Sequence, residues 1–346
     1  MRFNLTLSAC ALAAGVLLAG CGGGSDGDAG APNPGPGTPP PSGQAALTPQ
    51  NYIGVAQQVL SLNAFLVNSS DFVMGAQVET QTGDVLALQR IAQKQLLQSM
   101  QHFGRHSALA TGVQYTETER CDNGGSITAT VDDRNGNDEP DAGDSVTLTM
   151  RDCLEDGVLM NGQLAVYYTQ VSGDPERFPF TLGANVQMSN FSVSQGQMRA
   201  SGSGTLKMVV TARAPNDQSL VLSTPHFTSS ASYGAETLTQ TVRDYETTVR
   251  MTPAAGAYAA NIATTVAGVL ASSALESRTV LIATPEALYR SSTQRYPSRG
   301  YSTISGAGGS SVRITALDAT SVRIELDADG NGSYELGETR RWSELF

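Results

Sequence analysis

The sequence has few charged residues, few aromatic residues and only two lysines, Lys94 and Lys207. Charged residues make up 15% and aromatic residues 6% of the 346 positions. The 21 basic and 32 acidic residues give a net charge of −11, the wrong sign for binding a phosphate backbone. The chain also has no lysine cluster that would hold it to an anionic membrane. We therefore expect no nucleic acid partner and no electrostatic attachment to lipid.

Signatures of nucleotide-dependent and nucleophilic enzymes are also missing. The sequence has no P-loop and no dinucleotide-binding fingerprint. One string, Gly23-Gly24-Ser25-Asp26-Gly27, fits the nucleophile pattern G-x-S-x-G, but it lies in a stretch of glycine and proline that offers no strand-to-helix elbow. We expect a non-catalytic protein.

No apolar run is long enough for a membrane-spanning helix, which needs about 20 residues. The apolar stretch from Ala9 to Leu18 is roughly half that length. Arg2 precedes it, and Leu18-Ala19-Gly20-Cys21 ends it. This order resembles a bacterial lipoprotein signal peptide with its lipobox. The alternatives are an ordinary secretory signal or a membrane-spanning helix.

The resemblance implies that residues 1–20 are removed and that Cys21 carries the acyl chains that anchor the protein in a lipid bilayer. In Gram-negative lipoproteins, an aspartate after the lipidated cysteine commonly means retention in the inner membrane. Gly22 stands there instead, which implies the outer membrane, facing either the periplasm or the cell surface. Removal of Arg2 leaves 20 basic and 32 acidic residues, a net charge of 20 − 32 = −12.

The composition divides the mature chain into three parts. Residues 21–46 hold the acylated cysteine and a glycine- and proline-rich tether without a large apolar side chain. Residues 47–110 show helical periodicity. Residues 111–346 alternate apolar and polar side chains with a period of two, as in Val146-Leu148-Met150 against Thr147-Thr149-Arg151.

Two helices are expected before the strands. Thr48 and Pro49 predict the start of the first, and its apolar face is formed by Tyr52, Ile53, Val55, Ala56, Val59 and Leu60. A second helix is predicted from near Asp84, with an apolar face that includes Leu88, Ile91, Leu96, Met100 and Phe103.

Further strands are expected at 157–171, 185–195, 206–210, 219–232, 235–251 and 278–284. The repeated SVRI at 311–314 and 321–324 predicts a hairpin that turns at 317–320, whereas 259–275 is ambiguous between helix and strand. Because no helix separates successive strands, we expect a mainly β protein. Its large antiparallel sheet, open and curved or barrel-like, would pack against the two N-terminal helices.

Two cysteines remain in the folded part of the chain, Cys121 and Cys153. An exported protein meets an oxidising compartment, so we expect a disulfide between them. The closed loop of 153 − 121 + 1 = 33 residues would stabilise the fold by about 3–4 kcal/mol. Free thiols or a metal site are the alternatives.

Two acidic runs have the spacing of oxygen ligands for calcium. The run from Asp327 to Glu338 fits D-x-[DN]-x-[DN]-G-x₅-E and resembles an EF-hand calcium loop. The resemblance implies six ligand positions: Asp327, Asp329, Asn331, the backbone carbonyl of Ser333, Glu335, and a bidentate Glu338. A strand is expected before the loop where an EF-hand has a helix.

The second, weaker candidate lies between the two cysteines. It consists of Asp133, Asn135, Asn137, Asp141 and Asp144, and it has Asp138 where the EF-hand pattern has glycine. For both runs the alternative is a solvated hairpin tip, since Asn-Gly and Asp-Gly are strong turn formers.

Two function classes follow from these features. The first is a lipid-anchored, non-catalytic binding or scaffolding module with calcium-stabilised loops, whose protein or ligand partner the sequence does not reveal. The second is a periplasmic carrier that holds a lipid or other apolar ligand between the sheet and the helices.

Overall fold

The computed structural model describes residues 43–74 and 113–345, apart from 138, 156, 175–176 and 257–258. All of these residues belong to one compact unit, Pro40–Phe346. The predicted signal peptide, Cys21 and the predicted second helix from Asp84 to Phe103 lie outside the described residues. No described helix is both long enough and apolar enough to cross a membrane.

Helix α1, Tyr52–Met74, is the one α-helix in the described part of the chain. It starts three residues later than Thr48 and Pro49 predict, because residues 49–51 form a turn in which the amide N–H groups of Asn51 and Tyr52 both donate to the Thr48 carbonyl. The predicted apolar face is confirmed, since Val55, Ala56 and Val59 are buried.

Fourteen strands form a single sheet in which every strand pairs antiparallel with its neighbours in the sequence. Their bounds are β1 Val113–Arg120, β2 Ser126–Asp133, β3 Ser145–Glu155, β4 Val158–Ser172, β5 Phe180–Gln195, β6 Met198–Ala214, β7 Asp217–Tyr233, β8 Glu236–Pro253, β9 Ala260–Ser272, β10 Thr279–Ser291, β11 Arg299–Ser305, β12 Ser311–Ala316, β13 Ser321–Asp327 and β14 Leu336–Arg341. The sheet is open, with β1 and β14 at its two edges. The fold is therefore mainly β, as predicted, and its sheet does not close.

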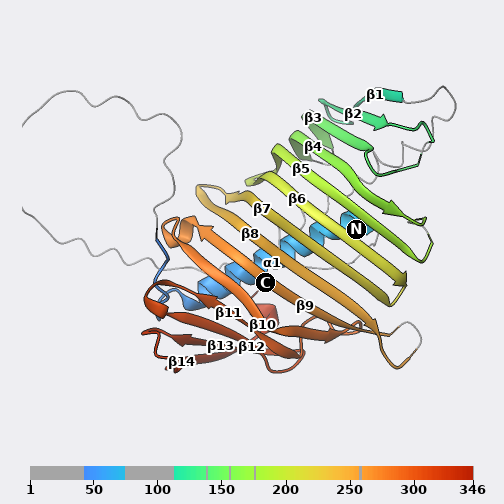
Figure 1. Ribbon diagram of the computed structural model, residues 1–346. Coiled ribbons are helices and arrows are strands. Elements are labelled where there is room, and N and C mark those ends of the chain that lie inside the picture. Colours follow the sequence, from blue (N-terminus) through green and yellow to red (C-terminus); the bar gives the residue numbers. More distant parts are fainter. Residues whose placement is uncertain are drawn as a thin grey trace, which may run out of the picture. The chain divides into compact units, whose positions relative to one another are not determined.

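Alternation of side chains gives the sheet two different faces. The inner face bears the buried apolar residues and packs against α1, which contacts β7, β12 and β13 (Figure 1). The SVRI hairpin shows the rule. Ile314 pairs with Ile324 on the inner face and both are buried, whereas Arg313 pairs with Glu325 on the outer face. The outer face carries mainly hydroxyl, amide and charged side chains.

Irregular pairing recurs on consecutive long strands. Register shifts interrupt the pairing of β3 with β4, and further shifts lie along β4 to β11. Residues with positive φ lie at or beside several of these register shifts. Two such residues, Gly162 and Asn190, lie next to each other on neighbouring strands. A Cβ on Gly162 would lie 2.2 Å from the carbonyl oxygen of Asn190, which itself has φ 49°. Only glycine fits at position 162, so this β-bulge depends on its small size.

The N-terminal end of the described chain is hydrogen-bonded to residues between 279 and 310. The amide N–H of Ala45 donates to the Thr279 carbonyl (2.8 Å), and the Ala45 carbonyl accepts from the N–H of Ala307 (2.8 Å). The N–H of Leu47 donates to the Ser310 hydroxyl (3.1 Å). Ala45 and Leu47 are buried, so contacts of the folded body begin a few residues before the predicted boundary at 47.

The C-terminal end is held by Trp342, which is 1% exposed. Its backbone N–H donates to the Thr320 carbonyl (3.0 Å), its indole N–H donates to the Asp318 carbonyl (3.2 Å), and its ring stacks on Tyr296. The ambiguous segment 259–275 is strand β9 followed by a single 3₁₀ turn, Ser273–Leu275. Ile262, Val266 and Leu270 face the core along β9, and this burial decides for strand.

Candidate functional site

The acidic run from Asp327 to Glu338 joins β13 to β14 at one end of the sheet. Asp327 is the last residue of β13, is 3% exposed, and pairs with Ser311 on β12. As predicted, the segment before the run is a strand and not a helix. The loop therefore begins from a rigid, buried carboxylate.

Three carboxylates of this loop converge. Asp327, Asp329 and Glu335 each offer one oxygen, and these oxygens lie within 4.8 Å of one another. Asn331 connects the two exposed ones, because its side-chain amide donates to Asp329 (2.9 Å) and to Glu335 (3.3 Å). Carboxylate and amide oxygens are the hard ligands that calcium prefers. Of the six predicted positions, the structure brings these four together.

Backbone N–H groups hold the loop in this shape. The Asp327 carboxylate accepts from the N–H of Gly330 (2.8 Å), Asn331 (3.2 Å) and Gly332 (2.9 Å). Gly330 has φ 76°, and a Cβ there would lie 2.7 Å from the Gly308 carbonyl oxygen. Position 330 therefore requires glycine for both conformation and space. Ser333 is exposed, and its N–H donates to the side-chain oxygen of Asn331 (2.7 Å).

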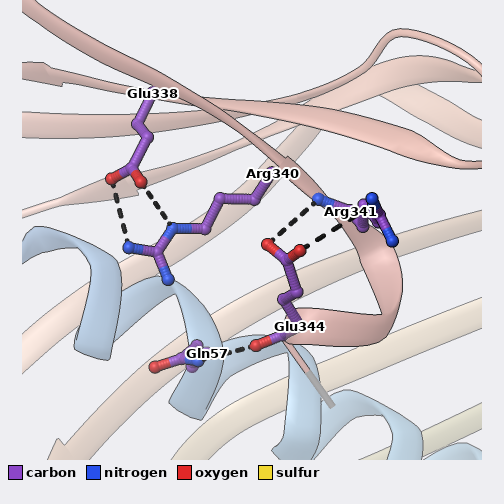
Figure 2. Close-up of polar contacts among 5 residues, drawn as sticks. All are labelled: Gln57, Glu338, Arg340, Arg341 and Glu344. Atoms are coloured by element: carbon purple, nitrogen blue, oxygen red, sulfur yellow. Dashed lines mark hydrogen bonds and ion pairs between the residues drawn. The ribbon is translucent and has the colours of Figure 1, made fainter.

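Glu338 does not join the cluster. It lies on β14 opposite Ile324, and both of its oxygens accept from the guanidinium of Arg340, at 3.0 and 3.2 Å (Figure 2). In an EF-hand this position supplies the bidentate ligand. The regular pairing of β14 with β13 places Glu338 on the inner face instead, where its partner is an arginine.

A neighbouring network on the outer face was not predicted from the sequence. Tyr334, inside the loop, lies under the guanidinium of Arg313 (4.1 Å to the ring centroid), and its hydroxyl accepts from Ser311 (3.3 Å). Arg313 donates two hydrogen bonds to Glu325, and Arg323 forms an ion pair with the same carboxylate (2.9 Å). The repeated SVRI contains both arginines and was the available signal, but strand register was needed to bring them to one glutamate.

The second acidic run joins β2 to β3. Asp133 and Asp144 are buried, and they accept hydrogen bonds from the N–H groups of Gly136, Arg134 and Asp141. Asp141 accepts from the side-chain amides of Asn135 and Asn137. Asp138 lies outside the described residues, and within the described part of this loop three carboxylates do not converge. The first loop is therefore the better candidate.

Asp144 also lies near a buried tyrosine. The backbone N–H of Tyr168 donates to the Asp144 carbonyl (2.9 Å), and the tyrosine side chain is 5% exposed. Burial, with a smaller contribution from the Asp144 charge, raises the pKa of Tyr168 to about 12. The phenol therefore stays neutral well above the pH at which an exposed tyrosine ionises.

The predicted disulfide is present. Cys121 follows β1 and Cys153 lies in β3, with their Cα atoms 5.4 Å apart. Both residues are buried, and because their sulfurs are bonded to each other neither offers a thiolate to a metal. The bond connects the edge strand β1 to β3 across the end of β2.

The comparisons with known proteins do not indicate a family for this chain. No protein-family model matches the sequence, and neither the curated proteins nor the solved structures include a match.

Proposed function

We propose that this chain is a lipoprotein of the outer membrane, anchored through Cys21, whose folded body is a non-catalytic binding or scaffolding module with a calcium-stabilised loop. The observation that carries the anchor is the string Leu18-Ala19-Gly20-Cys21 at the end of a short apolar stretch. Gly22, in place of an aspartate after the cysteine, supports a location in the outer membrane. Cys21 lies outside the described residues, so this part of the proposal depends on the sequence.

The way the chain enters the folded body agrees with a tethered module. From Cys21 to Gly43 there are 43 − 21 = 22 residue steps, which span at most about 75 Å. Gly43 is hydrogen-bonded to the sheet, because its carbonyl accepts from the N–H of Thr279 (3.2 Å). A lipid on Cys21 would therefore hold the body near the bilayer at one defined point.

Burial of the inner face favours a module over an apolar carrier. Val55 and Val59 of α1 are 1% and 4% exposed, and Leu222 and Ile324 of the sheet are both 0% exposed. Contacts within the chain already bury these side chains, so no bound lipid is needed to shield them from water. The surfaces that remain for a partner are the outer face and the two edges of the sheet.

The convergent loop oxygens of Asp327, Asp329 and Glu335 support calcium as its ligand. Three carboxylates this close repel one another when all are charged, and a divalent cation removes that repulsion. Asn331 would supply the fourth oxygen after turning its side-chain amide. In this proposal calcium has a structural role and takes part in no reaction.

Membrane fractionation of a Cys21→Ser variant, expressed in a Gram-negative host, tests the anchor. The wild-type protein should stay with the outer membrane through a high-salt wash, whereas the variant should be soluble in the periplasm or remain an uncleaved precursor. Cys10→Ser is the matched control, because it changes a cysteine in the same signal region and should leave the anchor intact. If Cys21→Ser fractionates like the wild type, the protein is not anchored through this residue.

A further inference from the structure

Three arginines lie in a band across the outer face of the sheet. Arg250 on β8 pairs with Ala263 on β9, which pairs with Tyr289 on β10, which pairs with Arg299 on β11. These four residues therefore share one row. Their neighbours Ile262 and Leu288 are buried on the inner face, so the row faces outward.

The third arginine lies one rung away. Arg323 on β13 pairs with Thr315 on β12, and Thr315 pairs with Tyr301 on β11, two residues after Arg299. We call Arg250, Arg299 and Arg323 the outer arginine band. It crosses β8 to β13 on the face opposite α1.

Two of the three arginines in the band have charges that no ion pair among the described residues neutralises. Among the described residues, Arg250 and Arg299 form no ion pair, and both are exposed. Arg299 stacks on Tyr289, with its guanidinium carbon 4.2 Å from the ring centroid, which fixes its direction and leaves its N–H groups available.

Arg323 is 52% exposed and shares Glu325 with Arg313, so two cations meet one carboxylate. Three further acids lie near the band. Glu286 is opposite Tyr301, Asp327 follows Glu325 on the same face, and Asp217, two residues before Ser219 of β7, which pairs with Arg250, forms an ion pair with Arg213 (3.9 Å). Arg250 and Arg299 therefore keep their charges on a chain whose net charge is −11, whereas Arg323 shares the charge of Glu325 with Arg313.

The spacing of the band indicates the kind of anion that fits. Adjacent strands lie about 4.8 Å apart, so Arg250 and Arg299, three strands apart, are separated by about 14 Å at their Cα atoms. Arg299 and Arg323 are two strands and one two-residue step apart, which gives about 12 Å. A DNA strand carries a phosphate about every 3.4 Å, far denser than these arginines.

We propose that the outer arginine band binds an acidic polysaccharide whose carboxylates are spaced along the chain, one to each of Arg250, Arg299 and Arg323. The guanidinium fork matches a carboxylate. Tyr301 and Thr315, in the row between Arg299 and Arg323, offer hydroxyl groups to the neutral sugar hydroxyls. This inference rests on the proposed binding module and names the class of its partner.

Binding of a hyaluronate octasaccharide to the purified full-length chain tests the inference, because this sugar carries a carboxylate on alternate residues. We expect saturable binding that weakens as salt is raised. Arg250→Gln and Arg299→Gln should each weaken it about fivefold to tenfold, and Arg299→Lys should restore part of the loss. Neither position touches the Glu325 network, so folding should persist, and thermal unfolding of each variant checks this.

Arg199→Gln is the matched control, since Arg199 is an exposed outer-face arginine on β6, outside the band. It should change the affinity less than about twofold. Any of four results would overturn the inference: no binding of hyaluronate, equal binding of a neutral oligosaccharide, an equal loss in Arg199→Gln, or tighter binding of single-stranded DNA or of vesicles containing anionic lipid. The measurement does not depend on the lipid at Cys21, so a failure here and a failure of the anchor are separate results.

Discussion

The hydroxyl of Tyr245 on β8 donates to the side-chain oxygen of Asn63 on α1, at 3.0 Å. Tyr245 is 1% exposed, and burial raises its pKa. This contact joins residues 182 positions apart and fixes α1 along the inner face. A buried hydroxyl of this kind must have a partner, so helix and sheet constrain each other here.

Tyr245→Phe should therefore lower the free energy of unfolding by about 1–2 kcal/mol, because Asn63 loses its donor without a change of shape. Asn63→Ala should cost a similar amount, and the double variant should cost less than the sum, with a coupling of about 0.5–1.5 kcal/mol. Urea unfolding of the four proteins measures this. Tyr233→Phe, at a tyrosine that is 58% exposed, is the control and should change nothing. Additive losses would show that the two side chains do not interact.

Reduction of the Cys121–Cys153 disulfide should destabilise the fold by about 3–4 kcal/mol, because the bond closes a loop of 33 residues. The double variant Cys121→Ser and Cys153→Ser should unfold at the same denaturant concentration as the reduced wild type. Alkylation in denaturant should label neither cysteine before reduction and both after it. Labelling of either one without a reductant would mean that the bond is absent.

Alkaline pH should destabilise the protein through Tyr168. Its folded pKa of about 12 lies above the ordinary value of 10.0, so its contribution is complete below pH 10 and is lost as the pH rises through 12. The loss should reach about 2–3 kcal/mol. Tyr168→Phe should flatten this part of the stability curve, measured by urea unfolding at successive pH values. If the variant loses stability as steeply as the wild type, another group causes the alkaline transition.

Millimolar calcium should raise the melting temperature, with magnesium substituting poorly. An ion that binds only the folded state at a hundredfold excess over its dissociation constant adds about 2.7 kcal/mol. The exposed carboxylates Asp329 and Glu335 are the residues to change, since the Asp327 carboxylate also accepts hydrogen bonds from backbone N–H groups. Asp329→Asn with Glu335→Gln should abolish the rise in thermal unfolding, measured in chelator and then in calcium.

Two controls locate the ion. Glu338→Gln should leave the calcium response unchanged, because Glu338 pairs with Arg340 and lies outside the cluster. Asp141→Asn tests the loop between β2 and β3. A response lost in Asp141→Asn and kept in the Asp329 and Glu335 variant would move the site to that loop, and no response in the wild type would leave both runs as solvated turns.

Side-chain alternation was enough to predict most strands and the direction of their faces. The SVRI hairpin illustrates this, since burial of Ile314 and Ile324 is fixed by local pattern and a short turn. Segment 259–275 was ambiguous because its alanines favour helix whereas Thr264-Thr265-Val266 favours strand, and the burial of Val266 and Leu270 in the core decides for strand.

The register of the strands and the open form of the sheet could not be predicted from this alternation. Whether the sheet closes depends on whether β1 meets β14, a contact between distant strands that no local pattern encodes. The β-bulges shift partners one residue at a time, as at Gly162 and Asn190. Spacing alone placed Glu338 among the calcium ligands, but the pairing of β14 turned it toward Arg340.

The fixed entry of the chain at Gly43–Leu47 sets an order of events during biosynthesis. Leu47 emerges early, yet its partner Ser310 follows 263 residues later. Ala45 likewise can form its backbone hydrogen bonds only after Thr279 and Ala307 have been synthesised. Contacts this distant in sequence form late in folding. Residues 45–47 therefore dock onto the folded body only after almost the entire polypeptide has been synthesised.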